Sequence, residues 1–405
     1  MSRTDCITFD PLPGTRKTAH EHSKSTRGRF VDLIKFLSTL KSNLDLANVT
    51  APPFFLAPSS VVENPASWAQ RPSLFTAPAK QGDPAKRSLS VLQLFLASLG
   101  SQLYVGGAPN VSIKKPLNAF LGELFLASWS DSDSSTRLAV EQVSHHPPIT
   151  AMHISSKDNG IRADGYGRVK MTFNGSINIQ QVGHAVLHMD RFDEDYLMPL
   201  PNVIVRGFMS ACLYPEIIGS YTIISSSGFV AEIDFSGTGL FTGKRNSFKA
   251  RVYHKGEPDK ICYHVSGVWS EGWKITDGNG KLVEIYEVDQ RSTAPIQLDP
   301  VEKQDPRESR RAWRDVISAL ERGDYRAATA AKQEVEERER QKRSEEKAHG
   351  NVWEPLLFQS KPGDEHQVFH HLSQGTNWEL LETETKGVWT INDAKLEQLQ
   401  SHGEQ

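Results

Sequence analysis

The chain has 405 residues, of which 38% are hydrophobic and 9% aromatic, as is typical of a folded, water-soluble protein. Its 46 basic and 49 acidic residues nearly balance, so no overall field favours nucleic acid as a partner. The three cysteines lie far apart and lack metal-ligand spacing, which argues against a zinc site or a disulfide framework and fits a reducing, cytosolic compartment.

The most apolar stretch, Val91 to Leu99, is about half of the ~18 residues that suggest a membrane span. The N-terminus carries Asp5 and Asp10 where a signal peptide needs an apolar core. We therefore expect a cytoplasmic protein that meets membranes only at their surface. Any attraction to acidic membranes must then come from local groups of basic residues.

Residues 1–27 are polar and without periodicity, which predicts a disordered leader. In residues 28–50, apolar side chains recur at helical spacing with polar residues between them, which predicts a short amphipathic helix. Because its apolar face needs a partner, we expect this helix to be a lid that covers a cavity or touches a membrane surface. That face consists of Phe30, Leu33, Ile34, Leu37 and Leu40.

The main predicted unit covers residues 51–300. Ala51 to Ala79 is rich in proline, and Leu89 to Leu103 has helical periodicity. From Lys115 to Val288, short β-branched or aromatic segments alternate with Gly, Asn, Asp and Ser, which predicts a large antiparallel sheet. Such a sheet exposes costly edges unless it curls into a near-complete β-barrel, which can enclose a hydrophobic tunnel for a lipid. The predicted fold class is mainly β with α.

Residues 301–358 are predicted to be a helical region of the same domain, because Ser309 to Glu346 is highly charged with one apolar face. Residues 359–405 are polar and poorly patterned, so we expect a polar tail.

Within the charged helix, Lys332, Glu336 and Arg340 are four residues apart. Each step of four advances about 40° round a helix, so the three side chains share one face. Taken alone, this spacing is also typical of an exposed helix with ion pairs.

Residues Glu141 to Pro148 read EQVSHHPP, two adjacent imidazoles before a double proline. Pro147 fixes its own φ and biases His146 away from the helical region, so a bend here can aim both rings at one ligand. The alternatives are a buried histidine pair at a strand end, a metal site that includes Glu141, and acid–base catalysis. No helical HExxH arrangement and no Gly-x-Ser-x-Gly nucleophile motif occurs. We therefore predict no metal, no cofactor and no catalytic residue.

The run EQVSHHPPITA resembles the signature of the oxysterol-binding protein family, and Lys114 to Glu123, KKPLNAFLGE, resembles a second segment of that family. The resemblance extends from Phe30 to Phe358. It implies a site for the headgroup of phosphatidylinositol 4-phosphate (PI4P), whose phosphates favour charge-assisted bonds from Lys, Arg and protonated His. The residues implied are Lys115, Asn118, His145, His146, Lys332, Glu336 and Arg340.

The resemblance also implies where an apolar cargo binds. In short sterol-binding members, glutamines at the tunnel floor meet the sterol hydroxyl, and by position these are Gln102 and Gln181, with Trp68 near the wall. Leu103 and Gly167 stand where those members carry a tyrosine and an asparagine. This departure leaves a glycerophospholipid such as phosphatidylserine open as the cargo.

Short members of the family are lipid carriers, so the resemblance implies a non-enzymatic protein that exchanges sterol for PI4P between organelle membranes. We expect a monomer whose partners are a sterol or other lipid, PI4P and acidic membrane surfaces, without nucleic acid. Its expected location is the cytoplasm and the periphery of endoplasmic reticulum, Golgi or plasma membrane contacts. The open alternatives are exchange of phosphatidylserine for PI4P, a phosphoinositide-dependent sensor and a lipid hydrolase.

Overall fold

The computed structural model describes residues 51–105, 111–207, 212–237, 244–288 and 292–403, together with Gly28, Val31 and Lys35. The five apolar residues of the predicted lid, Phe30, Leu33, Ile34, Leu37 and Leu40, lie outside the described residues.

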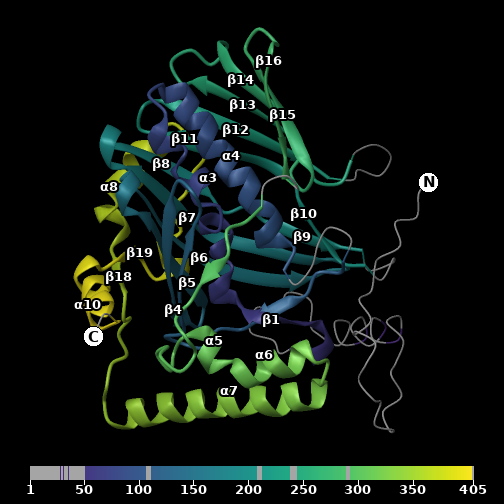
Figure 1. The fold of residues 1–405 in the computed structure, drawn as a ribbon, viewed down its shortest axis with the longest axis vertical. Helices are drawn as coiled ribbons and strands as arrows, with labels where there is room; N and C mark the ends of the chain where they lie inside the picture. Colours follow the sequence, from purple (N-terminus) through teal and green to yellow (C-terminus); the bar gives the residue numbers. More distant parts are fainter. Residues whose placement is uncertain are drawn as a thin grey trace.

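A 15-stranded antiparallel sheet forms the body of the protein (Figure 1). Across the sheet the strands follow the order β16 (Leu282–Glu287), β15 (Gly272–Asp277), β14 (Ile261–Val268), β13 (Ser247–His254), β12 (Phe229–Ser236), β11 (Gly219–Ser225), β8 (Glu194–Pro199), β7 (Ile177–Met189), β6 (Ile161–Phe173), β5 (Pro148–Ser156), β4 (Ser135–His145), β3 (Leu124–Ser130) and β17 (Ile296–Gln297). Beside this path, β9 (Val203–Arg206) pairs with β7 and with β10 (Tyr214–Ile217).

The sheet does not close into a complete barrel. Among the described strands, β16 and β17 are the two ends of the ladder and do not pair with each other. The expectation of a large, near-complete antiparallel barrel is confirmed in its strand content and direction. Local strand patterns do not predict whether the sheet closes into a barrel, because closure depends on whether the two end strands meet in space.

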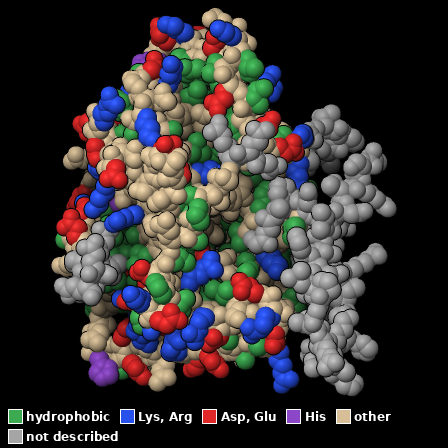
Figure 2. Space-filling model, viewed as in Figure 1, with side chains coloured by type: hydrophobic (Ala, Val, Ile, Leu, Met, Phe, Trp, Pro, Cys, Tyr) green, Lys and Arg blue, Asp and Glu red, His purple; other side chains and the backbone are tan. Residues whose placement is uncertain are grey.

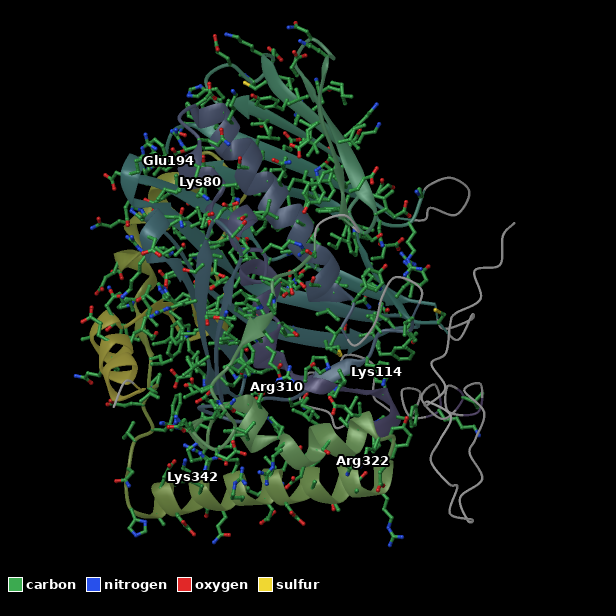
Figure 3. The ribbon with its side chains drawn as sticks, viewed as in Figure 1. Lys80, Lys114, Glu194, Arg310, Arg322 and Lys342 are labelled. Carbon is green, nitrogen blue, oxygen red and sulfur yellow. The ribbon has the colours of Figure 1, made fainter. Side chains whose placement is uncertain are left out.

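Helix α4 (Pro84–Leu103) lies across the strands and packs against β12 and β13 (Figure 1). Asp83 begins the helix, because its side chain accepts a hydrogen bond from the Lys86 N–H at 3.0 Å and proline follows at the first helical position. The buried guanidinium of Arg87 pairs at 2.5 Å with Glu194, labelled in Figure 3. The apolar side chains of this helix are part of the main hydrophobic core of the sheet.

A second layer, seen at the bottom of Figure 1, consists of α5 (Ser309–Ala312), α6 (Arg314–Glu321) and α7 (Tyr325–Ala348). These helices pack on a two-stranded parallel sheet of β1 (Leu56–Ser60) and β2 (Lys115–Leu117), around a core of their own that includes Trp313 and Leu117. Basic and acidic side chains are intermixed on the visible surface of this layer (Figure 2). The short helices α2 (Ala66–Ala69) and α3 (Pro72–Thr76) precede α4.

Residues 359–403, expected as a polar tail, are ordered and packed against the sheet. They form β18 (Phe358–Lys361), α8 (Gln367–Ser373), α9 (Glu382–Thr385), β19 (Val388–Ile391) and α10 (Asp393–Gly403). Phe369, Leu372 and Trp389 are buried against the sheet. Apolar residues spread over such short elements produce no clear periodicity, which is why the sequence pattern indicated a tail.

Two observations bear on the expectations from composition. Cys262 is a free thiol, but Cys212 is disulfide-bonded. The argument from the number and spacing of the cysteines against a disulfide therefore does not hold for Cys212. In the described ranges, no helix combines the length and the apolar character needed to cross a membrane.

Candidate functional site

The predicted histidines lie at the tip of the β4–β5 hairpin. Strand β4 ends at His145 and β5 begins at Pro148, so the turn consists of His146 and Pro147. The register of the hairpin shifts between Gln142 and Ser144, a bulge of the kind that re-aims side chains. The two imidazole rings are 4.5 Å apart, edge to face, and the His145 Nδ1 lies 3.2 Å from the Ala119 carbonyl oxygen.

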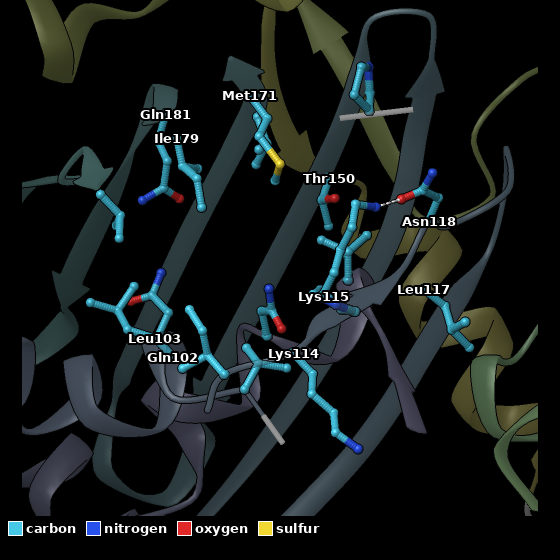
Figure 4. Close-up of a pocket in the computed structure, with 18 of the residues that line it drawn as sticks. Gln102, Leu103, Lys114, Lys115, Leu117, Asn118, Thr150, Met171, Ile179 and Gln181 are labelled. Carbon is cyan, nitrogen blue, oxygen red and sulfur yellow. Dashed lines mark hydrogen bonds between the residues drawn. The ribbon is translucent and has the colours of Figure 1, made fainter. Parts of the chain in front are cut away.

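Lys115 and Asn118 come from β2 and the residues that follow it. The Lys115 ammonium donates a hydrogen bond to the Asn118 side-chain oxygen (Figure 4). Burial, together with the positive charge of Lys332, lowers the pKa of Lys115 to about 8, while Glu336 opposes the change. Lys115 is therefore mostly charged at pH 7, but it is poorly solvated and favoured to pair with an anion.

The third segment is α7. Asp324 begins the helix by accepting a hydrogen bond from the Ala327 N–H at 3.0 Å. Lys332 is buried and pairs with Glu336, as the four-residue spacing predicted. Arg340 behaves differently: its side chain is 71% exposed and pairs at 2.5 Å with Glu337.

These three segments meet at one cavity of about 520 Å³. Five of the seven predicted headgroup residues line it. The sixth, Lys115, lines a neighbouring cavity, and the seventh, Lys332, is paired with Glu336 beside it. The full lining is Asn118, Ala119, Phe120, Leu121, His145, His146, Trp313, Val335, Glu336, Glu339, Arg340 and Arg343.

Sequence reasoning missed Glu339 and Arg343. Arg343 pairs with Glu346 at 2.6 Å, and its buried Nε has no hydrogen-bond partner among the described residues. Arg343 is three residues after Arg340, so the helical spacing held the signal for a second guanidinium at this cavity.

A second, mainly apolar cavity of about 180 Å³ adjoins the first, since Asn118 and Ala119 line both. Its lining includes Gln102, Leu103 and Gln181, which Figure 4 labels, and also Gly167. Its apolar lining includes Val105, Ile113, Val169, Met171, Ile177, Ile179, Val203 and Val205.

The three predicted cargo residues are placed differently from one another. Gln181 lines the apolar cavity, and its side-chain amide donates to the Pro201 carbonyl oxygen at 2.6 Å. Gln102 shares the same lining. Trp68 does not line this cavity: it is 3% exposed and packs within the main core.

The electrostatics of the polar cavity favour an anionic ligand. Burial lowers the pKa of His145, the neighbouring His146 lowers it further, and Glu336 acts in the opposite direction. An anion beside this ring would favour its protonated form and turn a neutral donor into a charged one. Lys114, Arg310, Arg322 and Lys342 add positive charge around the same end of the molecule (Figure 3).

An apolar cavity that adjoins a polar cavity with several cations is the arrangement expected of a protein that binds an amphipathic, anionic molecule. The comparison with known families agrees with this class. The model of the oxysterol-binding protein family matches residues 35–382, and the chain belongs to this family.

Two relatives share more than a third of their aligned residues with this chain. It is 44% identical to the probable transporter efuK of Hormonema carpetanum over 89% of this chain, which is about half (52%) of that protein's length. It is 36% identical to the protein kes1 of Schizosaccharomyces pombe, over 84% of this chain and 89% of that one.

The fold is also found in solved structures of lower identity. The Osh1 ORD domain in complex with ergosterol matches 97% of this chain and 93% of its own at a TM-score of 0.72 and 22% identity. The Osh3 ORD in complex with PI(4)P, from Saccharomyces cerevisiae, matches 93% of this chain and 99% of its own at a TM-score of 0.64 and 18% identity.

Proposed function

We propose that this protein is a lipid transfer protein that exchanges a sterol for PI4P between organelle membranes. The observation that carries the proposal is the convergence of three distant segments on one polar cavity beside an apolar one. The residues that line the polar cavity from these three segments are His145 and His146, then Asn118, then Glu336 and Arg340. Family membership supports the proposal, and so do the printed ligands of two structural relatives, ergosterol and PI(4)P.

In the proposed mechanism, the polar cavity holds the inositol phosphate and the apolar cavity takes the acyl chains. Lys115 and the histidines bind phosphate, because cationic donors form the strong hydrogen bonds to phosphate oxygens. Glu336 accepts hydrogen bonds from inositol hydroxyls. A sterol would occupy the same apolar cavity, so one lipid must leave before the other enters. No covalent step is required, and the protein works in the cytoplasm at membrane surfaces.

The test is extraction of labelled PI4P from liposomes by the double variant His145→Ala, His146→Ala. We expect extraction to be lost while an apolar cargo is still bound, since neither imidazole lines the apolar cavity. A matched control is His370→Ala with His371→Ala, an adjacent and exposed histidine pair on α8. Equal loss of both lipids in a folded His145, His146 variant would contradict the proposed division between the two cavities.

Phosphatidylserine is the second candidate cargo, and one feature of the apolar cavity favours it. Leu103 and Gly167 line the cavity where sterol-binding members carry hydroxyl- and amide-bearing side chains. A floor with fewer polar groups hydrates a sterol hydroxyl less well. Native mass spectrometry of the purified protein with its co-purified lipid distinguishes a sterol from phosphatidylserine by mass.

A further inference from the structure

Lys386 connects the C-terminal segment to the histidine hairpin. Its ammonium donates hydrogen bonds to the His146 carbonyl oxygen at 2.7 Å and to the Ser144 hydroxyl oxygen at 3.0 Å. Ser144 and His146 flank His145 on either side. The residue lies beyond position 382, where the match to the family model ends.

The segment that carries Lys386 is held firmly against the sheet. At its start, the buried Glu141 carboxylate accepts hydrogen bonds from the Leu356 N–H at 2.7 Å and the Leu357 N–H at 2.8 Å. Next to Lys386, Glu384 pairs with Arg168 of β6 at 3.1 Å. Strand β19 then packs against β5 and β6. Lys386 therefore acts from a fixed support and not from a loose tail.

The backbone at Lys386 lies in an unfavourable region for a residue with a side chain. Lys386 ends α9 with a φ of 55°, in the left-handed region that favours glycine at this position. The next residue, Gly387, is also left-handed, and a Cβ there would lie 2.1 Å from the Ser360 hydroxyl oxygen. The turn is thus tight, and a lysine occupies the place where glycine would form it with less strain.

We propose that Lys386 is a positioning residue for the PI4P headgroup site. By holding the His146 carbonyl and Ser144, its ammonium fixes the hairpin tip so that both imidazoles face the polar cavity before the ligand arrives. It also adds a positive charge next to a site for an anion. The inference rests on the proposed function, because it assigns Lys386 a part in binding the same phosphate.

The test uses Lys386→Met and Lys386→Gly, with Lys395→Met as the matched control. Lys395 belongs to the same C-terminal segment and also donates to a backbone carbonyl, that of Pro355 at 2.9 Å, whereas the Lys386 ammonium donates to the histidine hairpin. We expect both Lys386 variants to extract PI4P roughly three- to fivefold more weakly, because the exposed ammonium acts through the hairpin and exposed charges are screened by solvent. Lys395→Met should extract it normally.

Stability and apolar cargo separate positioning from a general structural role. Lys386→Gly should melt close to the temperature of the unchanged protein, because the relief of the left-handed backbone offsets the two exposed hydrogen bonds that the variant loses. Its binding of apolar cargo should be unchanged, and Lys386→Arg should restore most PI4P extraction.

The failure of this inference differs from the failure of the proposed function. If the unchanged protein extracts no PI4P, the proposed function is wrong and this inference falls with it. If the unchanged protein extracts PI4P and Lys386→Gly extracts it equally well, only the role of Lys386 is refuted. Parallel loss of PI4P and apolar cargo would also refute it, because a positioning residue for the headgroup site leaves the apolar cavity intact.

Discussion

At the residue scale, burial separates the two cations that the family pattern treats alike. Lys115 is largely removed from water, whereas the Arg340 side chain is 71% exposed and already paired with Glu337. Lys115→Ala should therefore weaken headgroup binding by about 1.5–3 kcal/mol. Arg340→Ala should cost about 1 kcal/mol or less, because an exposed ion is screened by solvent. Titration with PI4P liposomes measures the loss of affinity in each variant. A larger loss for Arg340→Ala than for Lys115→Ala would contradict the role given to burial.

The pKa of Lys115 also predicts how headgroup binding depends on pH. With a pKa of about 8, the free protein loses this charge as the pH rises from 7 to 9. Since the anion binds the charged form, affinity should fall by roughly tenfold at pH 9. Because the pKa of His145 is lowered, this ring becomes protonated only at acidic pH, where its positive charge should strengthen binding of the anion.

Liposome extraction at pH 7 and pH 9 tests this dependence, with Lys115→Arg as the comparison. Arginine stays charged throughout the range, so its variant should lose little affinity between the two pH values. An identical drop in both proteins would assign the alkaline loss to another group.

At the element scale, Glu123 joins the loop after β2 to the helical layer. Its carboxylate accepts hydrogen bonds from the Trp313 indole N–H at 2.9 Å and from the Phe120 N–H at 3.1 Å. Complete burial raises the pKa of Glu123 to about 7, so the folded protein holds a proton that the unfolded chain loses near pH 4.5. The contribution of Glu123 to stability is therefore complete below about pH 4.5 and decreases as the pH rises to 7.

Glu123→Gln keeps the shape but cannot ionise, so it should gain stability relative to the unchanged protein as the pH rises from 5 to 8. The expected gain is at most about 3 kcal/mol. Thermal melting of both proteins at the two pH values measures it. A difference in melting temperature that stays constant with pH would show that Glu123 does not titrate in this window.

The predicted lid is tested by deletion. Removing Met1 to Leu46 should leave the sheet folded, because the described residues of its core all follow position 51. Bound lipid should be lost faster, since a lid keeps apolar surface from water at a gain of about 25 cal/mol per Å². Retention of a fluorescent lipid after gel filtration is the measurement. Equal retention by the truncated and intact chains would mean that this helix is not a lid.

At the scale of the whole molecule, the two adjoining cavities predict that one lipid is bound at a time. Asn118 and Ala119 line both cavities, so under the proposed function the acyl chains of PI4P would enter the space of an apolar cargo. Native mass spectrometry should show protein with one lipid, and added PI4P should displace a bound sterol. A ternary complex of protein, sterol and PI4P would rule out exchange.

Transfer kinetics separate a carrier from a sensor. A carrier should move the apolar cargo between liposomes faster than spontaneous exchange does, and PI4P in the acceptor liposomes should increase the rate. A sensor would bind both lipids without accelerating transfer.

Local sequence patterns were sufficient for most of the sheet, and the resemblance to the oxysterol-binding protein family indicated the three segments of the polar cavity. Alternation of apolar and polar residues reports strands, and the four-residue spacing of Lys332, Glu336 and Arg340 reports one helix face. The adjacent histidines before Pro147 indicated a bend, and the structure has that turn at the hairpin tip. All of these signals lie within a few residues of one another, which is the range over which local geometry depends on the sequence.

Only the tertiary structure decided what distant residues do together. Lys386 contacts His146 across 240 positions, and Trp68 lies in the core instead of the cavity lining. The open edge of the sheet and the packing of the C-terminal segment also depend on contacts between distant residues. Such contacts depend on how completed elements pack, and no spacing within a single segment encodes which surface of another segment it will meet.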